Sequence, residues 1–192
     1  AAEGVAALRG TPPLLLLVAF PSADGTVRHV PGKLRACAAA GVDAAPLVLD
    51  SVDGTARAIA AMEEAIALRR PDAVFVQVPA PPDLDEAAIL RAIPPAADVD
   101  IMTPACFRSY MSGASDLPPV TISAALELLN HHDISVDGLA GVVAAGESPF
   151  ALMFAEALRR RGASVSLLPP AAPAWADALS AAELVVAAVG RS

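Results

Sequence analysis

The chain has 192 residues, 55% of them hydrophobic, and a formal net charge of −8, which suits one large or two small α/β domains with an apolar core. Its acidic residues are scattered and it has no basic stripe, so nucleic acid and anionic membrane surfaces are poor candidate partners. No apolar run approaches the roughly 20 residues that span a bilayer, and two cysteines make no disulfide framework, so we expect a cytoplasmic protein.

Short β-branched or leucine-rich runs alternate with alanine-rich segments, a pattern typical of parallel sheets with crossover helices. The predicted strands are Leu14–Phe20, Pro46–Asp50, Ala73–Val78, Leu139–Ala145, Ser164–Leu168 and Leu184–Val189. The predicted helices between them are Gly32–Ala40, Val52–Arg69, Leu84–Ile93, Thr121–His131, Pro149–Arg161 and Pro173–Ala181. Alanine has the highest helix propensity, which favours these assignments.

The alternation lapses over Pro94–Pro119, which we expect to be rich in loops, and a new series of strands and helices starts near Leu139. We therefore predict an α/β fold with an N-terminal α/β domain (residues 1–117), a Rossmann-like parallel-sheet domain (residues 118–192), and a cleft between them. The chain begins without Met and stops just after the last predicted strand, so we expect one or both ends of a longer protein to be missing.

The only lysine, Lys33, stands against twelve arginines and lies in the short amphipathic segment His29–Cys37. A lysine in a partly dry environment can lose its proton near neutral pH, whereas an arginine cannot. Lys33 is therefore the first candidate for acid–base chemistry. The alternative is that one lysine persists by chance in an arginine-biased composition.

Several short motifs follow one another along the chain: K-L-R-A-C from Lys33, V-Q-V-P-A-P from Val76, D-V-D from Asp98 and A-E-L-V-V-A-A-V-G from Ala182. Each motif is weak alone, but in this order and spacing they make the chain resemble the bifunctional methylenetetrahydrofolate dehydrogenase/cyclohydrolase family. The resemblance covers essentially the whole chain. It implies a tetrahydrofolate derivative as substrate and a homodimer.

The resemblance also implies a catalytic site made of Lys33, Gln77 and Asp100. The lysine would transfer protons and activate water, the glutamine would orient the lysine, and the aspartate would hold the pterin ring. A carboxylate suits that last role because it accepts paired hydrogen bonds from a 2-amino-pyrimidinone edge. Gln77 and Asp100 each have a structural alternative as well, in a loop and in a turn respectively.

Other positions of the folate site depart from the family. His29 replaces a tyrosine four residues before the lysine, and either keeps the pocket or is an ordinary surface histidine. Ile101 replaces a glycine after the D-V-D turn. Cys106, in the following loop, replaces an asparagine near the ligand, while Pro79 keeps its place in the strand exit; both are expected to contact substrate.

The second domain departs further. The family's G-x-S-x-x-V-G-x-P loop receives dinucleotide phosphates at a helix start, but neither alignment register restores it over Ala145, Gly146, Glu147 and Ser148. The Glu147 carboxylate would repel a phosphate. The segment Pro169–Ala172 replaces a basic segment that can hold the 2′-phosphate. Binding of NADP is therefore doubtful.

We expect no metal site, because the adjacent His131 and His132 would point about 100° apart on a helix and fit a helix C-terminus better. Arg159–Arg161 followed by Gly162 is likewise typical of a charged last helical turn with a glycine stop.

The leading hypothesis is a methenyltetrahydrofolate cyclohydrolase-type enzyme that retains the lysine, glutamine and aspartate and has a degraded NADP site. Two alternatives stay open. One is a full NADP-dependent methylenetetrahydrofolate dehydrogenase with bifunctional activity. The other is a non-catalytic folate-binding or scaffold subunit.

Overall fold

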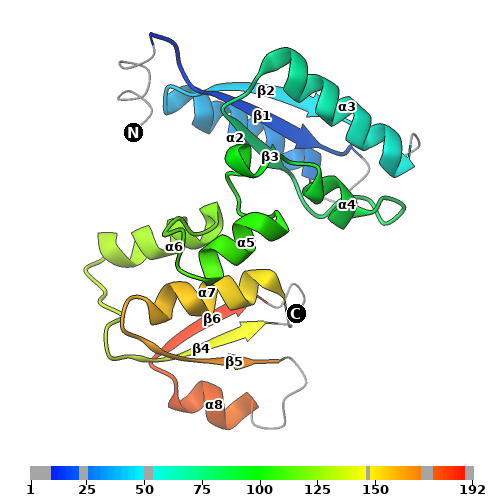
Figure 1. Cartoon of the computed structure of the whole chain (residues 1–192). Helices are drawn as coiled ribbons and strands as arrows, with labels where there is room; N and C mark the ends of the chain where they lie inside the picture. Colours follow the sequence, from blue (N-terminus) through cyan, green and yellow to red (C-terminus); the bar gives the residue numbers. More distant parts are fainter. Residues whose placement is uncertain (1–9, 22–25, 50–53, 146–147, 170–174, 189–192) are drawn as a thin grey trace. The chain divides into compact units, whose positions relative to one another are not determined.

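A computed structural model describes residues 10–21, 26–49, 54–145, 148–169 and 175–188 of the chain (Figure 1). The chain divides into two compact units, residues 1–104 and 105–192, and each contains a three-stranded parallel sheet. The predicted α/β fold class is confirmed. The division falls earlier in the chain than the domain boundary predicted after residue 117.

The sheet of the first unit has the strand order β2-β1-β3. Its strands are β1 (Leu14–Ala19), β2 (Asp43–Val48) and β3 (Ala73–Val76), and its helices are α2 (Thr26–Ala39), α3 (Gly54–Arg69), α4 (Glu86–Arg91) and the 3-10 helix η2 (Pro95–Ala97). The central strand is buried on both faces, as expected for a parallel sheet covered by helices. Leu16 and Val18 pack in the core on the α3 face, whereas Leu17 and Ala19 pack with Val30 of α2 on the other face.

The sheet of the second unit has the strand order β5-β4-β6. Its strands are β4 (Ala140–Ala145), β5 (Ser164–Leu168) and β6 (Leu184–Ala188), and its helices are α5 (Pro104–Met111), α6 (Val120–His131), α7 (Pro149–Arg159) and α8 (Trp175–Ala181). Trp175 packs α8 against Val142, Ala144 and Leu168 of the sheet. Helix α7 contributes a continuous buried face that includes Met153.

Two elements of the first unit begin earlier than their sequence predicts, and a proline lies inside each. Helix α2 contains Pro31 and begins at Thr26, six residues before the predicted start at Gly32. Strand β2 contains Pro46 and begins at Asp43. An edge strand tolerates proline because it can leave the missing N–H on its unpaired side, and β2 pairs only with β1. In α2 the packing of Val30 and Leu34 on the sheet outweighs the local cost of Pro31.

The stretch Pro94–Pro119 is mostly irregular, as expected, but it also contains η2 and α5, which the sequence did not predict. Pro104 is the first residue of α5, where its missing N–H has no helical partner to lose. The helix is held by Tyr110, whose side chain is buried. Within the described residues, no helix is long and apolar enough to cross a membrane.

Candidate functional site

A cavity of about 480 Å³ lies in the first unit and is lined by His29, Gly32, Lys33, Arg35 and Gln77. Its volume falls in the range of small-molecule sites, roughly 300–1,000 Å³. Three residues predicted from the sequence therefore share one cavity: the lysine, the glutamine and the histidine. Four of its five lining residues come from α2, and Gln77 comes from the end of β3.

Helical and strand periodicity explain why these side chains meet. His29 and Lys33 are four residues apart on α2, so they lie on one face of the helix. Gln77 follows β3 directly, and its backbone N–H donates to the Val18 carbonyl at 2.8 Å, which extends the ladder past the strand. Phe75 is two residues before Gln77, so both lie on the face of the sheet that α2 covers.

The Lys33 ammonium lies over the Phe75 ring, with Nζ 4.3 Å from the ring centroid. Phe75 is itself partly buried and packs against the cluster of Leu17, Ala19 and Val30. An ammonium over an aromatic face is attracted by the ring quadrupole, by about 0.5–1 kcal/mol at an exposed site and more where water is excluded. The side chain of the only lysine is therefore held against the sheet, although it is only half-buried.

In the Gln77 side-chain amide, the nitrogen makes a hydrogen bond and the oxygen makes none. Its Nε2 donates to the Val78 carbonyl at 3.0 Å. Its Oε1 is buried and has no hydrogen-bond partner, the one such side-chain atom found among the described residues. Since buried polar atoms are normally paired, a buried acceptor left open beside a cavity marks a place where a ligand or a moved side chain can donate. The chain then leaves the strand through the cis Val78–Pro79 bond.

The charges that line the cavity are all of one sign. Lys33 and Arg35 are cationic and His29 can become so, while no carboxylate is among the lining residues. The arrangement favours a ligand that carries negative or electron-rich groups.

The two aspartates of the D-V-D segment have different surroundings. Asp98 is buried, pairs with Val74 beside β3, and accepts from the backbone N–H groups of Met102 at 3.1 Å and Thr103 at 2.7 Å. This carboxylate holds the turn together, a role that the sequence analysis did not assign. Asp100 follows in a bend and is half-exposed, but it is not among the residues that line the cavity.

Ile101, which follows this turn, has a left-handed backbone with φ of 57° and a buried side chain. A β-branched residue is rarely found in this region because its Cβ crowds the following carbonyl. The resemblance places a glycine here, and glycine adopts this conformation without strain. The chain thus keeps the backbone geometry suited to glycine while carrying isoleucine.

The remaining candidates of the folate site are not among the residues that line the cavity. Pro79 is exposed. Cys106 belongs to the second unit and lies on α5, half-buried, so the expectation that it lies in a loop was wrong. The described residues contain no group of three or more His, Cys, Asp or Glu that could hold a metal ion. His131 ends α6 and His132 caps it, as the sequence predicts.

The predicted nucleotide loop is described only at its two ends, since Gly146 and Glu147 lie outside the described residues. Ala145 ends β4 and is buried. Ser148 is the N-cap of α7, and its hydroxyl oxygen accepts from the Ala151 N–H at 3.2 Å. Of the segment that replaces the basic motif, Pro169 is described, and its carbonyl accepts from Trp175 Nε1 at 2.6 Å; residues 170–172 are not described.

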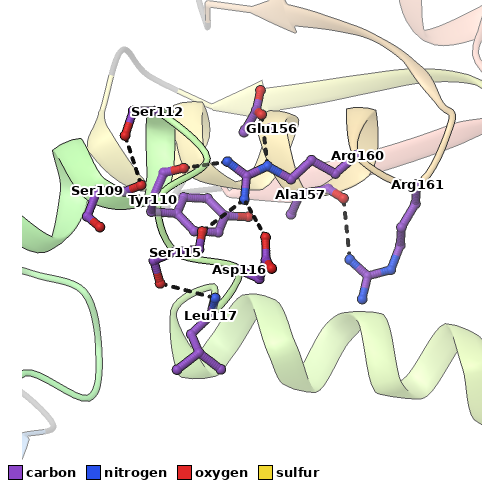
Figure 2. Close-up of polar contacts among 10 residues, drawn as sticks. All are labelled: Ser109, Tyr110, Ser112, Ser115, Asp116, Leu117, Glu156, Ala157, Arg160 and Arg161. Atoms are coloured by element: carbon purple, nitrogen blue, oxygen red, sulfur yellow. Dashed lines mark hydrogen bonds and ion pairs between the residues drawn. The ribbon is translucent and has the colours of Figure 1, made fainter.

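The arginine run at the end of α7 has a structural role (Figure 2). Arg160 donates to the carbonyl oxygens of Tyr110 and Ser115 and to Glu156 Oε1, and its guanidinium lies 4.4 Å from the Tyr110 ring centroid. Asp116 lies 3.9 Å from the same guanidinium. Burial raises the pKa of Tyr110 above its usual value of 10.0, and the nearby Arg160 charge opposes this shift only in part. Arg160 therefore fastens the end of α5 and the segment that follows it to the end of α7.

Sequence reasoning missed two residues at this site: Arg35, which lines the cavity, and Phe75, whose ring lies under the Lys33 ammonium. Phe75 was predicted only as part of a strand, yet its spacing of two from Gln77 already places both on one face. Arg35 lies two residues after Lys33, a spacing that on an ideal helix points away from it. Its guanidinium instead reaches back to within 4.0 Å of the position where Gly32 would carry a Cβ.

No family model matches the chain, but relatives and solved structures do. The chain is 31% identical over 186 residues to the bifunctional protein FolD of Magnetococcus marinus, covering 93% of this chain and 62% of that protein. The FolD methylenetetrahydrofolate dehydrogenase/cyclohydrolase of Campylobacter jejuni superposes with a TM-score of 0.88 at 21% identity, over 98% of this chain and 67% of that one.

A second solved structure, the Trypanosoma brucei FolD dehydrogenase-cyclohydrolase complexed with NADP cofactor and inhibitor, superposes with a TM-score of 0.84. It is 28% identical and is matched over 99% of this chain and 67% of that one. The chain spans between 42% and 65% of the length of the curated relatives that it matches.

Proposed function

Because this chain belongs to the FolD family of methylenetetrahydrofolate dehydrogenase/cyclohydrolases, we propose that it is a tetrahydrofolate one-carbon enzyme of the cyclohydrolase type. Its substrate would be 5,10-methenyltetrahydrofolate. The observation that carries the proposal is the cavity in which the only lysine of the chain lies with Gln77 and His29.

The reaction needs one water molecule and a group that moves protons. The methenyl carbon, bonded to N5 and N10, is an electrophilic amidinium carbon. Water adds to it while the neutral Lys33 amine takes a proton, giving a hydroxyl adduct. The bond from that carbon to N5 then breaks and its electrons stay on N5, the adduct oxygen becomes the formyl carbonyl, and Lys33 returns a proton to N5. The product is 10-formyltetrahydrofolate, and one proton is released overall.

The neighbours of Lys33 supply its position and charge balance. The open Gln77 Oε1 can accept a hydrogen bond from the lysine nitrogen, which would fix the direction of its lone pair. Arg35 adds a second positive charge to the cavity lining, which suits the anionic groups of a folate ligand. His29 would contact the ligand where the family has tyrosine.

We propose that Asp100 holds the pterin ring. Asp100 is half-exposed, whereas the neighbouring Asp98 is buried and accepts from two backbone N–H groups. Of the two aspartates in the turn, Asp100 is thus the one that a ligand can reach from solvent, and a carboxylate suits paired donors.

We further propose that NADP is not a cofactor of this chain. The described start of α7 fits a phosphate poorly, because Pro149 has no N–H and the Ala151 N–H is already bonded to Ser148. A helix N-terminus binds anions through free amides, and neither of these two positions of α7 offers one. The hypothesis of a full NADP-dependent dehydrogenase would need nucleotide contacts elsewhere.

The proposal is tested by following hydrolysis of 5,10-methenyltetrahydrofolate by the unchanged protein and by Lys33→Met and Lys33→Arg. Arginine keeps the positive charge but cannot give up a proton, so both variants should lose turnover if Lys33 transfers protons. Arg69→Met, on an exposed position in the last turn of α3, is the matched control and should keep full activity.

Binding measurements separate the alternatives. Calorimetry should show a bridged folate binding to the unchanged chain and no heat with NADP. Folate binding without turnover would favour a non-catalytic binding subunit. Saturable NADP binding with methylenetetrahydrofolate oxidation would favour the full dehydrogenase, and failure to bind any folate would refute the folate site itself.

A further inference from the structure

Phe75 occupies a position from which it can control the Lys33 amine. The Lys33 Nζ lies 4.3 Å from the ring centroid, and Phe75 reaches Lys33 from the strand that also presents Gln77. The Phe75 ring is held in place by the sheet, since it packs against Leu17 and Ala19 of the central strand. Its orientation therefore does not depend on the solvent-exposed side of α2.

The other groups around the Lys33 amine do not attract it, so its position depends on the Phe75 ring. From α2, the charged or titratable neighbours in the cavity lining are His29 and Arg35, both of which repel an ammonium when charged. From the strand side come Gln77 and Phe75, which carry no charge. With no carboxylate in the lining, the ring face is the attractive surface that keeps the amine from extending into water.

We propose that Phe75 is a positioning residue, whose ring holds the Lys33 amine at the end of β3 beside the open Gln77 Oε1. This inference deepens the proposed function, because it names a residue that acts through Lys33, and it rests on that function for its catalytic consequence. Phe75 acts on the substrate only through Lys33. Its role is to shorten the movement that brings the lysine nitrogen to Gln77 and to the substrate.

The single lysine allows a direct test. Reductive methylation with ¹³C-formaldehyde labels Lys33 and the terminal amine, and Lys33→Arg identifies which resonance belongs to Lys33. A methyl group held over an aromatic face is shifted upfield by the ring current. The Lys33 signal should be upfield in the unchanged protein and in Phe75→Trp, and it should move to the value of free dimethyl-lysine in Phe75→Leu.

The same variants are assayed with 5,10-methenyltetrahydrofolate. Phe75→Leu should lower kcat about two- to fivefold while KM changes little, because the cation–π contact at this partly exposed site holds the ammonium form of Lys33 that returns the proton to N5. Phe75→Trp should restore kcat. Leucine changes the buried volume only modestly, and a thermal melt of each variant shows that the first unit is folded.

The outcomes separate this inference from the proposed function. An upfield signal that depends on the aromatic ring, in a protein without turnover, would support the positioning of Lys33 and refute the cyclohydrolase. An identical Lys33 signal in the unchanged protein and Phe75→Leu would overturn the inference, whether or not the chain is an enzyme. Full kcat in Phe75→Leu would overturn it as well.

Discussion

The left-handed backbone at Ile101 predicts that glycine at this position is more stable than alanine, the reverse of the usual order. With φ of 57°, a residue with a Cβ costs roughly 1–2 kcal/mol, and glycine costs nothing. Against this, glycine loses about 0.4–1 kcal/mol more than alanine in backbone entropy on folding. Ile101→Gly should therefore be more stable than Ile101→Ala by about 0.5–1 kcal/mol. Both lose the buried side chain and should fall about 2–5 kcal/mol below the unchanged protein.

Ile89 provides the control, since it is fully buried in α4 of the same unit and its backbone is helical. At Ile89 the two variants should follow the usual order of stability, with Ile89→Ala more stable than Ile89→Gly by about 1 kcal/mol. The assay is urea unfolding followed by circular dichroism, comparing midpoints at equal slope. If Ile101→Gly proves less stable than Ile101→Ala, as at Ile89, the argument that strain is stored at this turn is refuted.

Two further predictions concern the second unit. Arg160→Met should destabilise it by about 1–3 kcal/mol in urea unfolding, because the Tyr110 and Ser115 carbonyls lose their donor. Arg161→Met should change stability by less than about 0.5 kcal/mol, because the Arg161 side chain donates to the Ala157 carbonyl at a long 3.4 Å. Equal losses in the two variants would contradict this assignment. Tyr110 is the only tyrosine, and its raised pKa means that the folded state holds the phenol proton more tightly than the unfolded state. Its contribution to stability should be complete below the unfolded pKa of 10.0 and lost as the pH rises through the folded pKa, and Tyr110→Phe should remove this alkaline decline; a tyrosinate absorbance titration midpoint at or below 10.0 would show the shift to be wrong.

Most of the regular structure could be predicted from the sequence, because the hydrophobic period and the alanine content indicate each strand or helix separately. Strand β5 matches its predicted bounds, and α6 and α7 differ by one or two residues. The misses occur where proline was interpreted by local rules alone. Pro31 and Pro46 were placed at or before element starts, although sheet packing and an edge position accommodate them. Pro104 in fact begins a helix.

The sequence predicted which residues belong to the candidate site better than it predicted the side chains that surround them. Lys33, Gln77 and His29 could be selected from composition and motif order, because residue type limits the chemistry available. Phe75 could not be selected in the same way, since an aromatic residue in a strand is far more often core than a partner for a cation. Asp98 and Asp100 look equivalent in sequence, and only the structure shows that Asp98 is buried and accepts from two backbone N–H groups of the turn.

The guanidinium of Arg160 also determines where the chain can be cut. Its acceptors on Tyr110 and Ser115 precede residue 118, while the arginine itself is the C-cap of α7. A fragment that starts at residue 118 would keep the donor and discard both carbonyls, whereas one that starts at residue 105 would keep the whole cluster. Of the two truncations, the longer one is the piece that should express as an autonomously folding module.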